Sequence, residues 1–98
     1  MIGTYNGKFT YSKPNITNWN SNQKGVYYLF NSLNNVVYVG KATGLDGIRG
    51  RLLQHLSERK WFDVSDFGYK VINTETEALR HEASEIKRLQ PRYNTQGL

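Results

Sequence analysis

Five side chains in this sequence could carry out chemistry together: two phenols, a guanidinium, an imidazole and a carboxylate. They belong to Tyr27, Tyr38, Arg51, His55 and Glu82. A guanidinium binds phosphate oxygens well, a phenol can accept a proton near a cation, and a carboxylate is a preferred ligand of Mg²⁺ and Mn²⁺. The chain has no cysteine and two histidines, which excludes thiolate chemistry and a zinc cluster. The set therefore predicts hydrolysis assisted by a divalent cation.

The two tyrosines fall in a predicted β-hairpin. Its strands are "GVYYLFN" at Gly25–Asn31 and "VVYVGKA" at Val36–Ala42, both rich in β-branched and aromatic residues. The polar segment Ser32–Asn35 separates them, and its asparagines can adopt the positive φ of a tight turn. We expect Asn31 to pair with Val36 across this turn.

The register of the hairpin decides which tyrosines share a face. The expected pairing places Leu29 opposite Tyr38. It also places Tyr27 opposite Gly40. Because side chains alternate with period two, Tyr27 and Tyr38 emerge on the same face, and Tyr28 faces the other way as a core residue. Strand propensity alone also favours tyrosine, so the hairpin by itself leaves a purely structural interpretation open.

The arginine and the histidine lie one turn apart in a predicted helix, "GIRGRLLQHLSERK", over residues 47–60. The helix has an apolar stripe at i, i+4 and i+8, formed by Ile48, Leu52 and Leu56. Arg51 and His55 lie on the flank of this stripe.

The glutamate belongs to a second predicted helix. Thr74 and Glu77 form a capping box at its start, and Pro91 stops it. The expected core-facing stripe comprises Ala78, Leu79, Ala83, Ile86, Leu89 and Gln90. Glu82 falls inside this stripe, whereas the residues expected on exposed faces are Glu77, His81, Glu85, Lys87 and Arg88.

A carboxylate on a core-facing stripe is costly unless a partner or a metal compensates for its burial. Two interpretations of Glu82 follow. It could form a structural ion pair, for example with Arg51, or it could be a metal ligand at the bottom of a cleft. The helix pattern alone does not choose between them.

These elements, with a third strand "DFGYKVIN" at 66–73, give the order ββαβα. The predicted fold class is α+β, a small three-stranded antiparallel sheet flanked by helices. We expect an N-terminal extension at 1–24, the domain at 25–94 and a C-terminal tail at 95–98. Within the extension, "GKFTYS" could form an edge strand and "ITNW" a turn of helix.

The composition bounds the class of protein. The chain has 98 residues, which predicts one small domain, and 13 basic against eight acidic residues give a net charge of +5. Such a balance favours a phosphate-bearing partner, although a generic soluble surface also fits it. No apolar run is long enough to cross a bilayer, and "MIGTYNGKFTYSKP" does not resemble a secretory leader, so we expect a cytoplasmic protein without a membrane partner.

Several short motifs in order resemble the GIY-YIG nuclease family, and most of all the N-terminal incision domain of UvrC-type excision-repair nucleases. They are "GVY" at Gly25–Tyr27, "YVG" at Tyr38–Gly40, "KA" at Lys41–Ala42, "GRL" at Gly50–Leu52, Glu82 and "RYN" at Arg92–Asn94. The segment "GLDG" at Gly44–Gly47 is longer than the repair enzymes usually have. The resemblance implies a GIY-YIG-like fold and a DNA endonuclease that uses Mg²⁺ or Mn²⁺ and leaves 5′-phosphate and 3′-hydroxyl ends.

The resemblance also implies roles for the residues that match. Glu82 would be the single metal ligand, and Arg51 would bind the scissile phosphate and stabilise its charge. Tyr27 and Tyr38 would position or deprotonate the attacking water, without a decision as to which is the base. His55 would relay a proton.

Three further residues are expected to contribute to substrate binding or to the arrangement of the site. Lys41 could depress the pKa of a neighbouring tyrosine, Asn94 would help to order the site, and Arg49 is a second candidate for binding phosphate. The DNA could be branched or damaged, and a protein partner could supply specificity. The alternative function is a non-catalytic nucleic-acid-binding or regulatory module with the same fold. Trp19, Trp61 and Phe62 are interpreted as packing residues.

Overall fold

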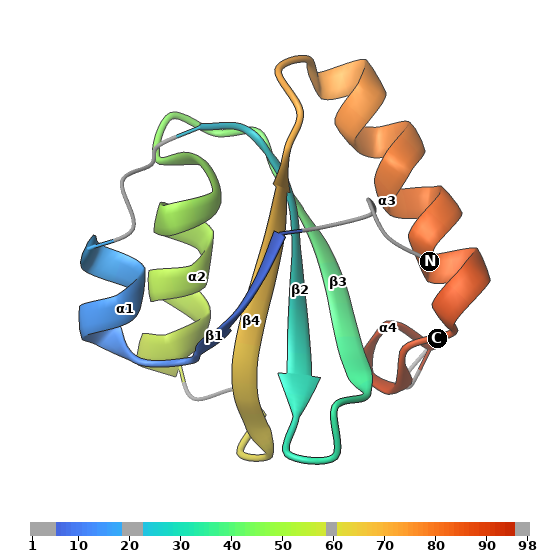
Figure 1. Cartoon of the computed structure of the whole chain (residues 1–98). Coiled ribbons are helices and arrows are strands. Elements are labelled where there is room, and N and C mark those ends of the chain that lie inside the picture. Colours follow the sequence, from blue (N-terminus) through green and yellow to red (C-terminus); the bar gives the residue numbers. More distant parts are fainter. Residues whose placement is uncertain (1–5, 19–22, 59–60, 96–98) are drawn as a thin grey trace.

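An antiparallel sheet separates the helices of this protein into two layers (Figure 1). The computed structural model describes residues 6–18, 23–58 and 61–95, so Trp19 and most of the predicted tail lie outside the described residues. The elements are β1 (Asn6–Thr10), α1 (Lys13–Asn18), β2 (Gly25–Asn31), β3 (Val36–Ala42), α2 (Gly47–Glu58), β4 (Val64–Val71), α3 (Glu75–Leu89) and α4 (Arg92–Thr95). The predicted α+β class is confirmed. Among the described residues, no helix has the length and apolar character needed to cross a membrane.

The sheet has four strands, in the order β1-β4-β2-β3, with antiparallel neighbours throughout. The predicted count of three is therefore wrong, because β1 pairs with β4. Phe9 lies opposite Phe67, their ring centroids 5.5 Å apart, and this aromatic pair supports the added strand. The boundaries expected at residues 24 and 94 stay predictions, but β1 and α1 pack on the rest of the fold.

The hairpin of β2 and β3 has most of the predicted register. Tyr27 pairs with Gly40, and Leu29 pairs with Tyr38, as expected. Nearer the turn the prediction is wrong, because an irregularity in the ladder makes Phe30, and not Asn31, the partner of Val36. The Asn31 side chain instead accepts hydrogen bonds from two backbone N–H groups of the turn, at 3.0 and 3.1 Å. This Asx-type turn competes with the last strand pair.

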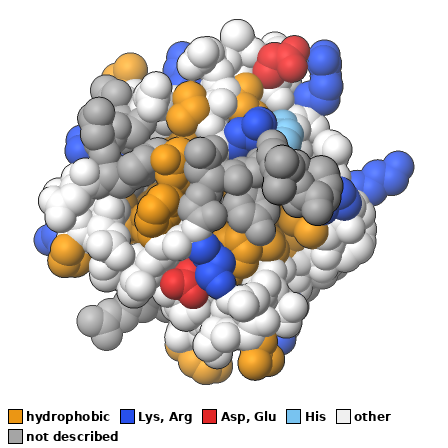
Figure 2. Space-filling model, in the orientation of Figure 1, with side chains coloured by type: hydrophobic (Ala, Val, Ile, Leu, Met, Phe, Trp, Pro, Cys, Tyr) orange, Lys and Arg blue, Asp and Glu red, His pale blue; other side chains and the backbone are white. Residues whose placement is uncertain are grey.

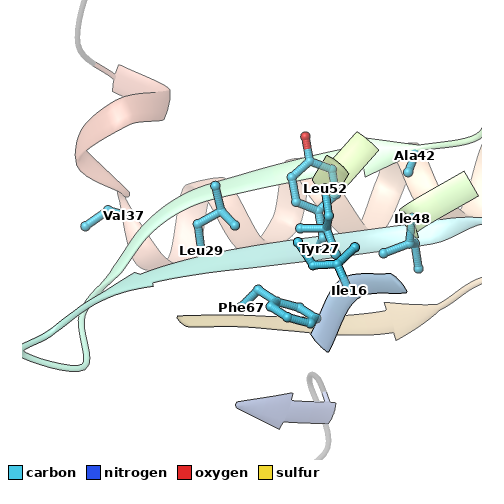
Figure 3. Close-up of a cluster of buried hydrophobic side chains, with 8 residues drawn as sticks. All are labelled: Ile16, Tyr27, Leu29, Val37, Ala42, Ile48, Leu52 and Phe67. Atoms are coloured by element: carbon cyan, nitrogen blue, oxygen red, sulfur yellow. The ribbon is translucent and has the colours of Figure 1, made fainter. Parts of the chain in front are cut away.

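Alternation along β2 divides the core between the two faces of the sheet. On the α2 face the buried residues are Ile16, Tyr27, Leu29, Val37, Ala42, Ile48, Leu52 and Phe67 (Figure 3). On the α3 face they are Val26, Tyr28, Phe30, Val39 and Ala78. Tyr27 and Tyr28 thus face opposite layers, as predicted, and the hydroxyl oxygen of Tyr27 points away from the apolar side chains around its ring (Figure 3).

Helix α3 has the predicted ends but not the predicted buried face. The Thr74 hydroxyl accepts a hydrogen bond from the Glu77 N–H at 3.2 Å, and Gln90 closes the helix in the left-handed conformation. However, Leu79 is 52% exposed and Ala83 is also exposed, whereas Glu85 is only 3% exposed. Polar contacts made by Glu85 with the sheet explain the difference, because they compensate for burial of its charge.

Candidate active site

Tyr27 and His55 make the central contact of the site. Helix α2 packs on the sheet through Ile48 and Leu52, and this places the His55 Nε2 atom 2.7 Å from the Tyr27 hydroxyl. Tyr27 is fully buried and His55 is 6% exposed. Gly40 makes room for this tyrosine, since a Cβ atom at that position would lie 2.3 Å from the phenol oxygen. Steric space for Tyr27 thus explains why the "YVG" motif has a glycine at this position.

The second phenol lies beside the first. The ring centroids of Tyr27 and Tyr38 are 6.0 Å apart, and those of Tyr38 and His55 are 5.6 Å apart. Burial, and then the neighbouring Tyr38 phenol, raise the pKa of Tyr27. Burial also raises the pKa of Tyr38, which a hydrogen bond from Tyr27 and the charge of Arg51 partly oppose. Both phenols are therefore protonated at neutral pH, with Tyr38 the less deeply buried of the two.

Glu82 reaches the open edge of the sheet from α3. Its side chain is half-buried, and burial raises the pKa of its carboxyl, against the lowering effects of the Lys41 charge and of a hydrogen bond with the Lys41 backbone. The described residues show no ion pair between Glu82 and Arg51, and the positive charge that acts on Glu82 is that of Lys41. Glu82 nevertheless lies close enough to Tyr38 to raise the pKa of that phenol.

Arg51 is partly exposed and lies near both phenols. Its charge lowers the pKa of both tyrosines, and its NH1 group donates a 2.7 Å hydrogen bond to the Gln54 side chain. It also lines a surface cleft, together with the Gly44–Gly47 segment. Arg49 lies about 200° around α2 from Arg51, on another face of the helix.

Lys41 lies next to Glu82, not next to the phenols. Its ammonium group is 3.9 Å from the Glu75 carboxylate, and strand alternation turns its side chain away from Tyr38. The positive charge that lowers the pKa of the tyrosines is that of Arg51, whereas Lys41 lowers the pKa of Glu82. This differs from the expected effect of Lys41 on a tyrosine.

Asn94 ties α4 to the same edge strand. Its amide accepts a hydrogen bond from the Val39 N–H at 2.8 Å and donates one to the Val39 carbonyl at 2.9 Å. The side chain thus imitates a paired strand and holds β3 where Tyr38 and Lys41 are displayed. Both of its polar atoms are occupied by this contact.

We expect Asn94→Ala to destabilise the protein by about 1–2 kcal/mol, because two side-chain hydrogen bonds to one residue are lost. Chemical denaturation of the variant would measure the change. As a control, Gln54→Ala removes a polar side chain from an exposed helix face and should have a smaller effect. Equal stability of Asn94→Ala and the parent protein would contradict the proposed tie.

Two aromatic residues complete the surroundings of the phenols. Trp61 packs on Tyr38 with ring centroids 4.5 Å apart, on His55 at 5.4 Å and, nearly parallel, on Tyr93 at 5.0 Å. Its interpretation as a packing residue fits this geometry, although no sequence spacing linked it to the site. Phe62 differs from expectation, since it is 96% exposed. Arg59 and Lys60, between α2 and Trp61, lie outside the described residues.

The sheet, the paired phenols on adjacent strands, and the arginine, histidine and edge carboxylate around them define a GIY-YIG domain. The model of the UvrC-like GIY-YIG domain matches residues 23–95, and the chain belongs to this family. The GIY-YIG N-terminal endonuclease domain of UvrC from Thermotoga maritima, bound to its catalytic magnesium, is 28% identical with a TM-score of 0.68, and the match covers 86% of this chain and 100% of that chain. A point mutant of that domain, also bound to the catalytic divalent cation, gives the same TM-score at 26% identity, covering 87% and 100%.

The curated relatives are also UvrC proteins. The UvrABC system protein C of Chelativorans sp. (strain BNC1) is 41% identical over 78 residues, which cover 74% of this chain and 12% of that protein. The corresponding protein of Brucella abortus (strain 2308) is 42% identical over 78 residues, covering 74% and 13%. This chain thus spans only about an eighth of the length of the curated relatives that it matches.

Proposed function

We propose that this domain is a divalent-metal-dependent endonuclease that hydrolyses DNA phosphodiester bonds, with Glu82 as its metal ligand. The observation that carries the proposal is the half-buried Glu82 carboxylate, which forms no ion pair with Arg51 among the described residues and lies beside Tyr38 and Lys41. The similar Thermotoga domain, crystallised with its catalytic magnesium, supports it.

The donor set fits Mg²⁺ or Mn²⁺. Within the described part of the chain, no three His, Cys, Asp or Glu side chains gather into a metal cluster. Mg²⁺ does not need such a cluster, because it is commonly bound by one or two carboxylates and keeps several waters. When bound, the cation would stabilise negative charge on the phosphate and favour ionisation of nearby groups.

The protein side chains would divide the remaining work among them. Tyr38 is the better general base, because it is less deeply buried than Tyr27 and a hydrogen bond from Tyr27 favours its phenolate. Tyr27 would orient Tyr38, and His55 would exchange a proton with Tyr27 across their 2.7 Å contact. Arg51 would bind the scissile phosphate through its fork of N–H donors and stabilise the charge that develops there.

Substrate binding beyond the reacting phosphate would rest on weaker contacts. Lys41 and Arg49 would contact the DNA backbone, and Asn94 would contribute by holding β3 in place. Lys and Arg side chains are spread over the face seen in Figure 2 and do not gather in one patch there. Non-specific contacts of this kind bind DNA with modest, salt-dependent affinity.

Specificity would therefore come from elsewhere. The relatives are components of the UvrABC system, and this chain corresponds to a small part of each. We propose that a protein partner or further segments deliver the domain to branched or damaged DNA, in an excision-repair setting. The competing proposal, a non-catalytic binding module, would need no cation.

A nicking assay on supercoiled plasmid tests the proposed function. We expect nicked product with Mg²⁺ or Mn²⁺ and none after EDTA treatment. Without a bound cation, the surrounding side chains leave both phenols protonated, so neither can accept a proton from water. Addition of excess Mg²⁺ to the EDTA-treated sample should restore cleavage. DNA binding without nicking under any of these cations would favour the non-catalytic module, and nicking that survives metal removal would contradict a metal-dependent mechanism.

A further inference from the structure

A second polar cluster lies on the opposite face of the sheet from the paired phenols. The Tyr28 hydroxyl donates to the Glu85 carboxylate at 2.7 Å and lies 2.9 Å from the His81 Nε2 atom. Arg88 donates twice to the same carboxylate, at 2.7 and 2.9 Å. We call Tyr28, His81, Glu85 and Arg88 the α3 network. It has no part in the proposed chemistry, yet it includes two of the most deeply buried polar side chains of the fold.

The α3 network opposes the apolar pattern of its own helix. Successive residues of an α-helix are about 100° apart, so the apolar stripe through Leu79, Ala83 and Ile86 and the buried face formed by Ala78 and Glu85 differ by roughly 110°. Burial of apolar surface alone would turn Leu79 and Ala83 toward the sheet. In the structure both are exposed, and Glu85 is buried in their place.

The energetic reason lies in the pairing of the buried charge. Arg88 and the Tyr28 hydroxyl hold the pKa of the Glu85 carboxyl below its usual range, despite its burial. Rolling α3 toward its apolar stripe would separate Glu85 from Tyr28 and leave the phenol hydroxyl buried without this acceptor. The Arg88–Glu85 pair lies within α3 and would move with the helix, so the cost of rolling is the lost hydrogen bond from Tyr28 to a charged acceptor together with an unsatisfied buried hydroxyl. This cost outweighs the gain from covering the half-exposed Leu79.

We propose that Tyr28, His81, Glu85 and Arg88 are positioning residues, which set the rotation of α3 on the sheet and so place Glu82 at the edge of β3. Glu82 follows His81 directly and precedes Glu85 by less than one turn, so any roll of the helix moves its carboxylate around the edge strand. The consequence for metal binding rests on the proposed function. The rotation itself does not.

Thiol labelling measures the rotation without a metal. The chain has no cysteine, so Ala83→Cys and Ser84→Cys each introduce a single probe at an exposed position. On rolling toward the apolar stripe the first probe approaches the sheet and the second stays in solvent. We expect Tyr28→Phe and Glu85→Ala to slow labelling of the Ala83→Cys thiol several-fold and to leave that of the Ser84→Cys thiol unchanged.

Glu77→Ala is the matched control for Glu85→Ala. Glu77 also pairs with an arginine three residues later, at 3.3 Å, but on an exposed face. The Glu77→Ala substitution should leave the labelling rates of both thiols unchanged. Glu85→Gln keeps an oxygen that can accept from Tyr28 and should restore most of the parent rate. Equal labelling of the Ala83→Cys thiol in all folded backgrounds would overturn the proposal, and Tyr28→Phe serves this purpose if Glu85→Ala fails to fold.

Titration with Mn²⁺ tests the consequence for Glu82. We expect the Kd for Mn²⁺ to rise about tenfold in Tyr28→Phe and Glu85→Ala, as for other residues that orient a metal ligand, and to stay constant in Glu77→Ala. A changed labelling rate with unchanged Mn²⁺ affinity would overturn the positioning of Glu82. If the parent protein binds no Mn²⁺ at all, the proposed function fails, while the labelling still decides whether the network sets the rotation.

Discussion

Glu82→Gln is expected to reduce DNA nicking by at least about 100-fold, to the background of the assay. The substitution keeps the shape and the hydrogen-bonding capacity of the side chain but removes the charge that would hold a cation. DNA binding should persist, because the Lys and Arg side chains that would contact the phosphates are unchanged. Nicking and filter binding, measured on the same preparation, would separate the two effects.

The stability of Glu82→Gln should move in the opposite direction from its activity. Burial raises the folded pKa of the Glu82 carboxyl, so its charge costs stability at neutral pH in the metal-free protein. The variant should therefore melt at the same or a higher temperature at pH 7, and this advantage should vanish as the pH falls and the carboxyl of the parent becomes protonated. Glu77→Gln, an exposed counterpart on α3, should still cut DNA.

These outcomes distinguish a metal ligand from a structural charge. A buried cation left without its partner would destabilise the variant by about 3–5 kcal/mol. A Glu82→Gln variant that melts much earlier and still nicks DNA would therefore exclude the role of metal ligand. Mn²⁺ titration of the variant gives the direct comparison, with loss of binding as the expected result.

Tyr38→Phe should lower the nicking rate by about 10²–10⁴-fold, the usual contribution of a general base. The raised pKa of Tyr38 means that little phenolate exists at neutral pH, and its fraction grows tenfold per pH unit below that pKa. The rate of the parent protein should therefore climb through the alkaline range, and Tyr38→Phe should lose this climb. A rate–pH profile between pH 6 and about pH 9.5 would measure it.

Tyr27→Phe provides the matched comparison for the base. It removes the hydrogen bond that lowers the pKa of Tyr38, so the alkaline climb should remain while the rate falls at each pH. The ring of Tyr27 fills the slot over Gly40 in either case, which keeps the packing intact. If Tyr27→Phe abolishes the pH dependence and Tyr38→Phe keeps it, Tyr27 is the base and the assignment is reversed.

The sequence predicts on which face of the sheet each hairpin residue lies, because side chains alternate strictly along a strand. Two residues of opposite parity cannot share a face, so Tyr27 and Tyr28 separate once the register is known. Strand alternation does not predict the pairing at the turn, because the Asn31 side chain competes with the backbone for the same N–H groups. The sequence predicts β1 only as a possible edge strand, because its five residues contain a single large apolar side chain.

The rotation of α3 could not be predicted from the hydrophobic pattern. Such a pattern counts glutamate and histidine as surface residues, whereas Glu85 is buried by partners on β2 and on its own next turn. The same limit applies to Trp61, whose contacts with Tyr38 and Tyr93 depend on tertiary packing. The ends of α3 can be predicted from sequence, because Thr74 and Pro91 act on the backbone next to them and do not depend on tertiary packing.

The contacts on β3 also bear on the solubility of the folded protein. An edge strand offers alternating backbone groups on which a second chain can add a strand, and this is a route to aggregation. Asn94 occupies both outward backbone groups of Val39, and Glu82 bonds to the backbone two residues further along, at Lys41. The Asn94 and Glu82 side chains thus also block strand addition at this edge. Asn94→Ala would leave the outward backbone groups of Val39 open to a second chain, in addition to loosening β3.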